Sequence, residues 1–570
     1  MSLLFRSASL VLLWILISRV KLSFGYFNLT ILHTNDCSDR IEEFSGSGST
    51  CTPEIRADDG CFGGVARRST VLKDIREGGT GNESIILVDT GDQFQGTDWF
   101  YVYKGNSTAH FMSLLEYDVM GLSKNEFLRG VPGLIPFLNL IDFPAVSSNI
   151  DTSNEPALQS LLSRSRVITV GGEKVGVVGV TKPDTPQLTP TGNLTFLPVI
   201  ESVQAAVDNL VDDQGVNKII ALSDSSFDID QEIARSVRGV DIVVGGHFNT
   251  FLYTGDPPYD DNAKKGDYPL VINPSYNDSL EVLLVTAYRL GKYLGYLEVT
   301  FDDDGVVTSY AGNPIVLDKN IEEDPLVLEQ VETYKVLVDE ISTTVVGSSD
   351  VELSGRVSVC GVGECNLGDM LSDSMRLFHG TENEVHIAIT SAGSFASSIE
   401  QGNITISDLT RTLPYGDTID ILSLTGRSIM DILERSVEDF EKSTPTTAFL
   451  QLSGLKVEFN LDRGNGERVE SVELLCDSCD GGYTDIDVDG VYLVAMNSYI
   501  AGGQEGYTII LERTISRETG NLDVDVAADF LRENSPFKSS LPRIVFSGSS
   551  MLKAPIPWVL FLLSLCSLIA

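Results

Sequence analysis

Short apolar runs that end in polar residues recur along the first half of the chain. Four carry the pattern: Leu29–His33 before Thr34-Asn35-Asp36, Ile85–Val88 before Asp89-Thr90-Gly91-Asp92, Lys218–Leu222 before Ser223-Asp224-Ser225, and Val240–Val244 before Gly245-Gly246-His247-Phe248-Asn249. Such runs are typical of strands buried on both faces of a sheet. Helical patterns such as Ile200–Val211 lie between them. The alternative, four unrelated polar loops, would not repeat one order, so we expect an α/β fold with a polar site at its strand ends.

A second pattern predicts where the chain divides. The segment Glu322–Ile341 has helical periodicity, with Pro325 early and acids in its first turn, as at a helix start. A chain of 570 residues is long enough for two large domains with separate cores. We therefore expect a first domain over 26–318, a linker helix over 319–345 and a second domain over 346–547.

Composition changes this picture only through charge. The chain is 42% hydrophobic and 21% charged, which is ordinary for a globular protein. Its 40 basic and 81 acidic residues give a formal net charge of −41. That excess argues against nucleic acid as a partner, because phosphate backbones are bound by basic side chains. A solvated acidic surface explains most of the excess.

Both ends predict processing for the cell surface. Residues 1–25 resemble a secretory signal peptide, with Arg6 before an apolar run and small residues before Tyr26. Small residues at Ser547-Gly548-Ser549-Ser550, a spacer and the apolar tail Trp558–Ala570 resemble a GPI signal. We expect attachment at Ser547 and removal of 548–570, which places the protein outside the cell, membrane-anchored or shed. A membrane helix or a poorly formed tail anchor is the alternative, but both runs are short for a span.

The cysteines and glycosylation motifs fit an exported protein. Neighbouring cysteines predict three small-loop disulfides: Cys51 with Cys61, Cys360 with Cys365, and Cys476 with Cys479. Cys37 is left over, and Cys566 lies in the removed tail. A zinc site at Cys476 and Cys479 lacks a second ligand pair. Motifs for N-glycosylation begin at Asn28, Asn82, Asn106, Asn193, Asn277 and Asn403.

Longer motifs resemble a known family. They are ILHTND (31–36), GGVARR (63–68), ILVDTGDQFQG (86–96), VGVVGVT (175–181), VRGVDIVVGGHFNTFLYTG (237–255), LGKYLGYLEV (290–299), ECNLGDMLSD (364–373), FLQLSGLKVEFNL (449–461) and NSYIAGGQEGY (497–507). The chain resembles the ecto-5′-nucleotidase/apyrase family of secreted or GPI-anchored nucleotide hydrolases. The resemblance implies an N-terminal calcineurin-like metallophosphatase α/β sandwich that carries two divalent metals, zinc in the family. It also implies a C-terminal α/β domain with the nucleotide site, through which family members commonly dimerise.

The resemblance also shows which metal ligands are kept. Those retained are Asp36, Asp92, His247 and Asn249, whereas Ser38, Lys124 and Asp224 stand where the family has ligands of other types. A charged lysine has no lone pair to offer a metal. No cofactor is therefore expected, or at most one metal. We expect the Lys124 ammonium to pair with Asp36, Asp92 and Asp224 and so replace the charge of the ion.

The catalytic pair of the family is replaced independently of the metals. Its histidine position is Asn125 and its aspartate position is Leu128. Asparagine is not an acid or base near neutral pH, and losing a general acid–base group costs roughly 10²–10⁴ in rate.

In the second domain the phosphate side is lost and the base side is kept. The arginine of the family's phosphate loop is Ala396, and the loop between Cys360 and Cys365 carries no arginine. Tyr415 and Tyr499 match the two aromatic residues that stack on the base, and Glu505 matches an acid that faces the ribose. The alternative is that both tyrosines only pack. With the phosphate partners missing, a nucleoside fits better than a nucleotide.

Two functions remain open from the sequence. The first is a catalytically impaired or inactive cell-surface homologue that binds a nucleoside or a protein. The second is an active, metal-dependent 5′-nucleotidase or apyrase that hydrolyses extracellular nucleotides to nucleosides and phosphate. A further hypothesis concerns Lys265-Gly266-Asp267, which resembles an integrin-binding tripeptide in a segment that otherwise reads as a plain exposed loop.

Overall fold

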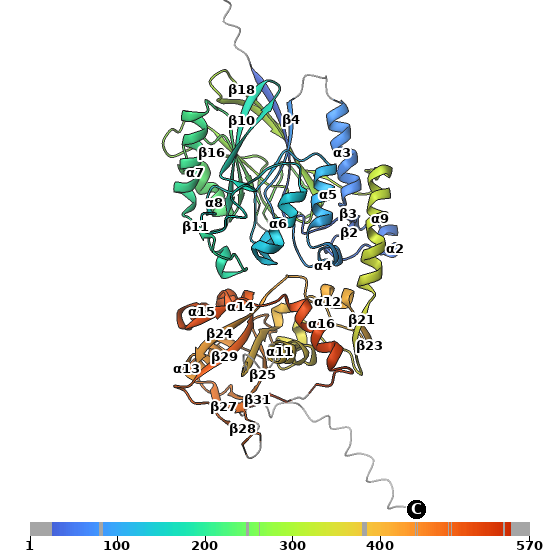
Figure 1. The fold of residues 1–570 in the computed structure, drawn as a ribbon, viewed down its shortest axis with the longest axis vertical. Helices are drawn as coiled ribbons and strands as arrows, with labels where there is room; N and C mark the ends of the chain where they lie inside the picture. Colours follow the sequence, from blue (N-terminus) through green and yellow to red (C-terminus); the bar gives the residue numbers. More distant parts are fainter. Residues whose placement is uncertain are drawn as a thin grey trace, which may run out of the picture.

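The computed structural model describes residues 26–548 apart from 79–83, 247–249, 261–262, 379–384, 439, 442, 477, 480–481 and 540–541. The described chain forms two stacked domains, with helix α9 (Pro325–Ser342) running along one side where they join (Figure 1). The Asp324 side chain accepts the Leu326 N–H, and Pro325 occupies the first position of α9. Both features are typical of a helix start. The helix predicted at Glu322–Ile341 is therefore confirmed. The signal segment and the tail from residue 549 lie outside the described residues.

The first domain contains two sheets. One has the order β19 (Val307–Gly312), β18 (Tyr293–Phe301), β1 (Phe27–Thr34), β4 (Ser84–Asp89), β5 (Val119–Met120), β6 (Ala145–Val146) and β8 (Leu162–Ser163), with β20 (Ile315–Val316) beside β18. The other has the order β16 (Leu270–Ile272), β17 (Val282–Val285), β13 (Ile242–Gly245), β12 (Ile219–Asp224), β10 (Glu173–Thr181) and β9 (Ser165–Val170). Strands β1, β4, β12 and β13 confirm the four predicted from the apolar runs.

An apolar core between the two sheets holds this domain together. It includes Leu29 and Ile86 from one sheet and Val177 and Leu222 from the other. Every residue of β12 is buried, as expected for a strand covered on both faces. Helices pack outside the sheets: α3 (Val65–Gly78), α5 (Asn106–Leu114) and α6 (Gly130–Leu140) on one side, α7 (Val199–Asp208) and α8 (Phe227–Ser236) on the other (Figure 1). The predicted helix Ile200–Val211 is α7, which continues as a π-helical turn, Asn209–Asp213.

Short elements complete the first domain. They are the strand pairs β2 (Phe44–Ser45) with β3 (Cys61–Phe62), β7 (Ile150–Asp151) with β11 (Thr195–Phe196), and β14 (Phe251–Leu252) with β15 (Lys264–Gly266), and the helices α2 (Pro53–Ala57) and α4 (Asp98–Tyr103).

The second domain packs helices against a mixed five-stranded sheet. Its order is β25 (Leu450–Ser453), β22 (Ile387–Ser391), β29 (Val491–Asn497), β24 (Ile419–Thr425) and β30 (Ser516–Glu518). A four-stranded sheet has the order β28 (Tyr483–Asp485), β27 (Val469–Leu475), β26 (Leu455–Asn460) and β31 (Ile544–Ser547), and β21 (Val345–Ser349) pairs with β23 (Gly402–Thr405). The helices are α10 (Val357–Cys360), α11 (Asn366–Leu377), α12 (Ile406–Thr412), α13 (Gly426–Ser436), α14 (Ser498–Ala501), α15 (Thr508–Arg513) and α16 (Asp523–Glu533). Among the described helices, none combines the length and apolar character needed to cross a membrane.

Side chains of the two domains meet directly. Asp98, at the start of α4, accepts hydrogen bonds from Ser407 Oγ at 2.8 Å and from Thr410 Oγ1, both in α12. Gly96 lies so close to the second domain that an added Cβ would stand 2.6 Å from the Pro414 carbonyl oxygen. These contacts join helix α4 and the loop before it to the second domain.

Candidate functional site

Three carboxylates meet at the carboxyl ends of parallel strands in the first domain. Asp36 follows β1, Asp92 follows β4, and Asp224 ends β12. All three are buried. Burial raises the pKa of Asp36 well above its usual range, and the nearby charges of Asp92 and Asp224 raise it further. β1 and β4 are parallel neighbours in one sheet, whereas β12 brings Asp224 to the same place from the other sheet. The sequence therefore predicted correctly that polar residues at these strand ends meet.

The backbone holds two of these acids, Asp36 and Asp92, and the nearby Ser38 in a conformation that side-chain-bearing residues seldom adopt. The φ angles of Asp36, Ser38 and Asp92 are 49°, 51° and 63°, in the left-handed region. Gly91 precedes Asp92 at φ 104°, and an added Cβ would stand 2.7 Å from the Ser123 amide nitrogen. Backbone strain of this kind is concentrated at functional sites. The loops after β4 and β5 thus pack too closely for any larger residue at position 91.

Glu126 ties the loops after β4 and β5 together. Its carboxylate accepts the backbone N–H groups of Ser123 at 2.7 Å, Gln93 at 2.7 Å and Asp92 at 3.2 Å. Burial, followed by the charge of Asp92, raises the pKa of Glu126 to about 8. Sequence reasoning missed this residue, because an acid beside an apolar residue is usually exposed and its sequence neighbours do not reveal that it is buried.

The partner predicted for Lys124 is wrong. Its Nζ donates to Asn125 Oδ1 at 2.8 Å, and the Asn125 side-chain amide donates in turn to Asp92 Oδ1. Within the described ranges, no ion pair joins Lys124 to a carboxylate. Asn125 stands between them because it is buried beside Asp92, whereas Lys124 is only half-buried. The Lys124 ammonium is therefore linked to the Asp92 carboxylate through the side-chain amide of Asn125.

The described residues do not by themselves fit a two-metal centre. Asp92 Oδ1, which would face an ion, already accepts the Asn125 amide. The Ser38 hydroxyl donates to Gln95 Oε1 at 2.8 Å. Ligand atoms of His, Cys, Asp or Glu come within 4.8 Å of one another in threes only at Glu43, Cys51 and Cys61, among the residues described. His247 and Asn249 lie outside the described residues.

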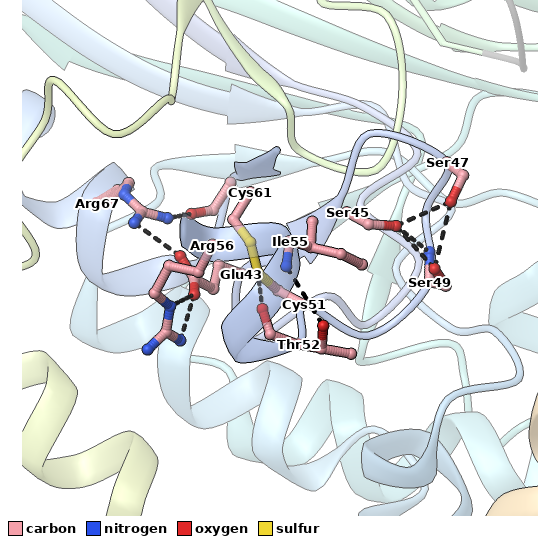
Figure 2. The surroundings of a disulfide bond; sticks show 11 residues. Glu43, Ser45, Ser47, Ser49, Cys51, Thr52, Ile55, Arg56, Cys61 and Arg67 are labelled. Atoms are coloured by element: carbon pink, nitrogen blue, oxygen red, sulfur yellow. Dashed lines mark hydrogen bonds and ion pairs between the residues drawn. A yellow bond between two sulfur atoms is a disulfide. The ribbon is translucent and has the colours of Figure 1, made fainter. Parts of the chain in front are cut away.

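That last group is a disulfide and an ion-pair cluster, not a metal centre. Cys51 and Cys61 are bonded to each other, and Figure 2 shows Glu43 beside them between Arg56 and Arg67. The Glu43 carboxylate lies 2.7 Å from the Arg67 guanidinium, and both side chains are buried. The two sulfurs are therefore held in a disulfide and the carboxylate in ion pairs with arginines, so none of them is available to a metal ion.

Leu128 belongs to the core and to the domain contact. Its side chain is 3% exposed and packs in the apolar cluster of α3, α5 and α6. It also faces the second domain, since a Cβ added to Gly416 would stand 3.0 Å from Leu128 Cδ1. The position of the catalytic aspartate thus holds an aliphatic side chain that touches the loop carrying Tyr415.

The second domain brings the predicted base-binding residues together. Tyr415 and Tyr499 are each 43% exposed. Burial raises the pKa of both phenols, and the negative charges of Asp417 and Glu505 raise it further. Glu505 has φ 54°, and an added Cβ on Gly393 would stand 2.5 Å from its Oε1. Glu505 therefore lies over the loop 392–396, which the resemblance matches to the family's phosphate loop.

Comparisons with known proteins identify the family. A family model described as "5'-nucleotidase, C-terminal domain" matches residues 345–512. The snake venom 5'-nucleotidase of Naja atra is 40% identical over 543 residues, which cover 92% of this chain and 100% of the relative.

The chain belongs to the 5'-nucleotidase family. The 5'-nucleotidase of Homo sapiens is 40% identical over 541 residues and is covered to 92%. Among solved structures, the 5'-nucleotidase precursor from Thermus thermophilus aligns with a TM-score of 0.65 at 34% identity, over 91% of this chain and 99% of that chain. The fold is thus the expected one, a calcineurin-like N-terminal domain followed by a C-terminal 5'-nucleotidase domain.

The other family features predicted from the sequence are placed as follows. Disulfides join Cys51 to Cys61, Cys360 to Cys365, and Cys476 to Cys479, which confirms all three, and Cys37 is free and buried. The glycosylation motifs at Asn28, Asn106, Asn193, Asn277 and Asn403 begin at exposed residues, and Asn82 lies outside the described residues. Lys265 and Gly266 lie in β15, and the Asp267 carboxylate forms a 3.3 Å ion pair with Lys264. Integrin binding by this tripeptide stays a prediction.

Proposed function

We propose that this member of the 5'-nucleotidase family has lost nucleotide hydrolysis and binds a nucleoside at the cell surface. The observation that carries the proposal is the hydrogen-bonded chain from Lys124 through Asn125 to Asp92. In a two-metal site the bridging carboxylate must face the ions. Here an amide donor takes that oxygen, and a cation stands directly behind the amide.

The loss of acid–base groups supports the same proposal. Asn125 carries an amide, which does not exchange a proton near neutral pH. Leu128 is aliphatic and packed between the domains. No orienting carboxylate can therefore act from position 128. These two replacements would slow hydrolysis even if a metal were bound.

The nucleoside part of the proposal rests on the second domain. Tyr415 and Tyr499 keep partly exposed rings that lie near the Glu505 carboxylate. Aromatic faces stack on a nucleobase, and a carboxylate accepts hydrogen bonds from ribose hydroxyls. Ala396 stands where the family has its phosphate-binding arginine, and the loss of that arginine favours a ligand without a phosphate.

A second candidate is an enzyme with altered metal chemistry. Its support is the crowding of Asp36, Asp92 and Asp224, since three neighbouring carboxylates attract a hard cation. An active enzyme of this kind would release nucleosides and phosphate from extracellular nucleotides.

The proposed location follows from the two ends of the chain. A cleaved signal over 1–25 and a GPI anchor near Ser547 would place both domains on the outer face of the membrane. Release of phosphatidylinositol-linked protein by a specific phospholipase would test the anchor.

The deciding experiment measures metal content and AMP hydrolysis on one preparation purified without chelator. The comparison is a revertant with Ser38→His, Lys124→Asn, Asn125→His, Leu128→Asp and Asp224→His. We expect a metal-free, inert wild type and a revertant that gains zinc. A matched control, Lys174→Asn on the exposed end of β10, should change neither property. Wild-type protein that holds a transition metal and cleaves AMP above a metal-free sample would overturn the proposal in favour of the second candidate.

A further inference from the structure

Buried hydrogen-bond acceptors gather where the phosphate loop of the family would lie. Ser391 ends β22 and Asn497 ends β29, and these strands are parallel neighbours. Ser391 is 0% exposed and Asn497 is 2% exposed. Ser391 Oγ and Asn497 Oδ1 find no hydrogen-bond partner among the residues described. A buried polar atom without a partner is rare, and a ligand is one way to satisfy it.

Two carboxylates border the same place. Asp417 accepts the Ser498 hydroxyl at 2.8 Å and the Asn497 side-chain amide at 3.2 Å. Glu505 lies over Gly393, and its Oε2 is buried without a hydrogen-bond partner in the part of the chain described. Burial raises the pKa of Glu505, and the nearby side chains of Thr447 and Ser391 lower it in part. The acceptors and the acids therefore belong to one site.

The charge of Arg435 favours the ionised form of Glu505 and lowers its pKa against the larger effect of burial, but Arg435 pairs with Glu438 instead. Neither Asp417 nor Glu505 takes part in an ion pair within the described ranges. The nearby Arg435 donates instead to the backbone carbonyl oxygens of Glu505 at 3.1 Å and Gly506 at 3.2 Å. Ala396, at the family's arginine position, donates its backbone N–H to the Thr412 carbonyl. The site thus offers acceptors and negative charge where the family offers guanidinium groups.

The aromatic residues stand within the field of those acids. Tyr415 lies two residues before Asp417, and Tyr499 directly follows Ser498, whose hydroxyl donates to Asp417 at 2.8 Å. Burial raises the pKa of both phenols, and the charges of Asp417 and Glu505 raise it further. Aromatic faces attract cations, and a neighbouring carboxylate strengthens that attraction. A phosphate in the same place would meet repulsion and no charged donor.

We propose that the site prefers a nucleoside whose base carries a positive charge, such as an N-methylated purine, over neutral nucleosides and over 5′-phosphates. The base would stack between Tyr415 and Tyr499, and ribose hydroxyls would donate to Glu505, Asn497 and Ser391. This inference rests on the proposed nucleoside binding and adds the charge of the ligand to it.

The test measures affinities of the full-length ectodomain for three ligands by calorimetry near neutral pH. They are 1-methyladenosine as the cation, adenosine as the neutral ligand and AMP as the anion. We expect 1-methyladenosine to bind about tenfold more tightly than adenosine, because cation–π attraction adds to stacking. AMP should bind most weakly. Added salt should reduce the differences in affinity among the three ligands, because it screens the charge interactions that cause them.

A pair of variants tests the cause. Glu505→Gln should weaken the binding of 1-methyladenosine about tenfold and the binding of adenosine by less, since the substitution removes only the attraction between the carboxylate and a positive charge. Glu512→Gln, on the exposed surface of α15, is the matched control and should keep the wild-type ratio. Melting temperatures of both variants check that each is folded.

The outcomes separate this inference from the function on which it rests. If adenosine binds and 1-methyladenosine binds no more tightly, the charge preference is wrong and nucleoside binding stands. If none of the three ligands binds to folded protein, nucleoside binding itself fails. Tightest binding by AMP would overturn both.

Discussion

Truncation of Leu128 to alanine should weaken both the contact between the domains and the apolar core of α3, α5 and α6 in the first domain. Leu128 is 3% exposed and contacts Gly416 across the domain boundary. Removal of a buried leucine side chain costs about 2–5 kcal/mol, because apolar contact is lost and a cavity remains. For domains of this size, about 3 kcal/mol corresponds to a fall in melting temperature of roughly 6–12 °C.

A second substitution isolates the cross-domain part of that cost. Gly416 has φ 68°, where a side chain costs about 1–2 kcal/mol in backbone strain. In Gly416→Ala the new Cβ would also press against Leu128 Cδ1, at 3.0 Å. The Leu128→Ala background removes this pressure but not the backbone strain. The double variant should therefore be more stable than the sum of the single effects, by about 0.5–3 kcal/mol.

The assay is urea unfolding of four proteins: the wild type, Leu128→Ala, Gly416→Ala and the double variant. Leu134→Ala serves as the control, because Leu134 is buried in α6 within the same core. Its effect should add to that of Gly416→Ala. If the effects of Leu128→Ala and Gly416→Ala also add, the two residues do not touch in solution and the account of position 128 fails.

Two further predictions concern buried charges. Glu43→Gln should cost about 3–5 kcal/mol in the free energy of unfolding, because it leaves the Arg67 guanidinium buried without its carboxylate. Glu470→Gln, which breaks a more exposed pair with Arg463, should cost less than about 1 kcal/mol, and equal losses would contradict this account. Burial raises the pKa of Asp241 from 3.8 to about 8, so the folded state keeps a proton that the unfolded state loses, and stability should fall as pH rises through that window. Asp241→Asn should remove this part of the fall, so that the stability of the variant relative to wild type increases from pH 4 to pH 8. If the melting temperatures of the two proteins instead change with pH in parallel, the pKa of Asp241 is not raised.

The sequence alone determined the layout of the protein. Apolar runs long enough for buried strands predicted β1, β4, β12 and β13, because a strand covered on both faces has no room for alternating polar residues. Cysteines separated by 10, 5 and 3 residues predicted three small-loop disulfides by proximity, and the structure has all three. The replacements at Lys124, Asn125 and Leu128 were visible as residue types.

The tertiary structure decided which atoms those residues meet. Sequence reasoning assigned Lys124 to the acids, but the buried Asn125 amide reaches Asp92 first. It treated Leu128 as a lost catalytic group, whereas the fold places it against Gly416 of the other domain. It did not find Ser391 and Asn497, because an unsatisfied oxygen is defined by its surroundings and not by its residue type. Contacts between residues hundreds of positions apart depend on how domains and side chains pack, and no local pattern encodes them.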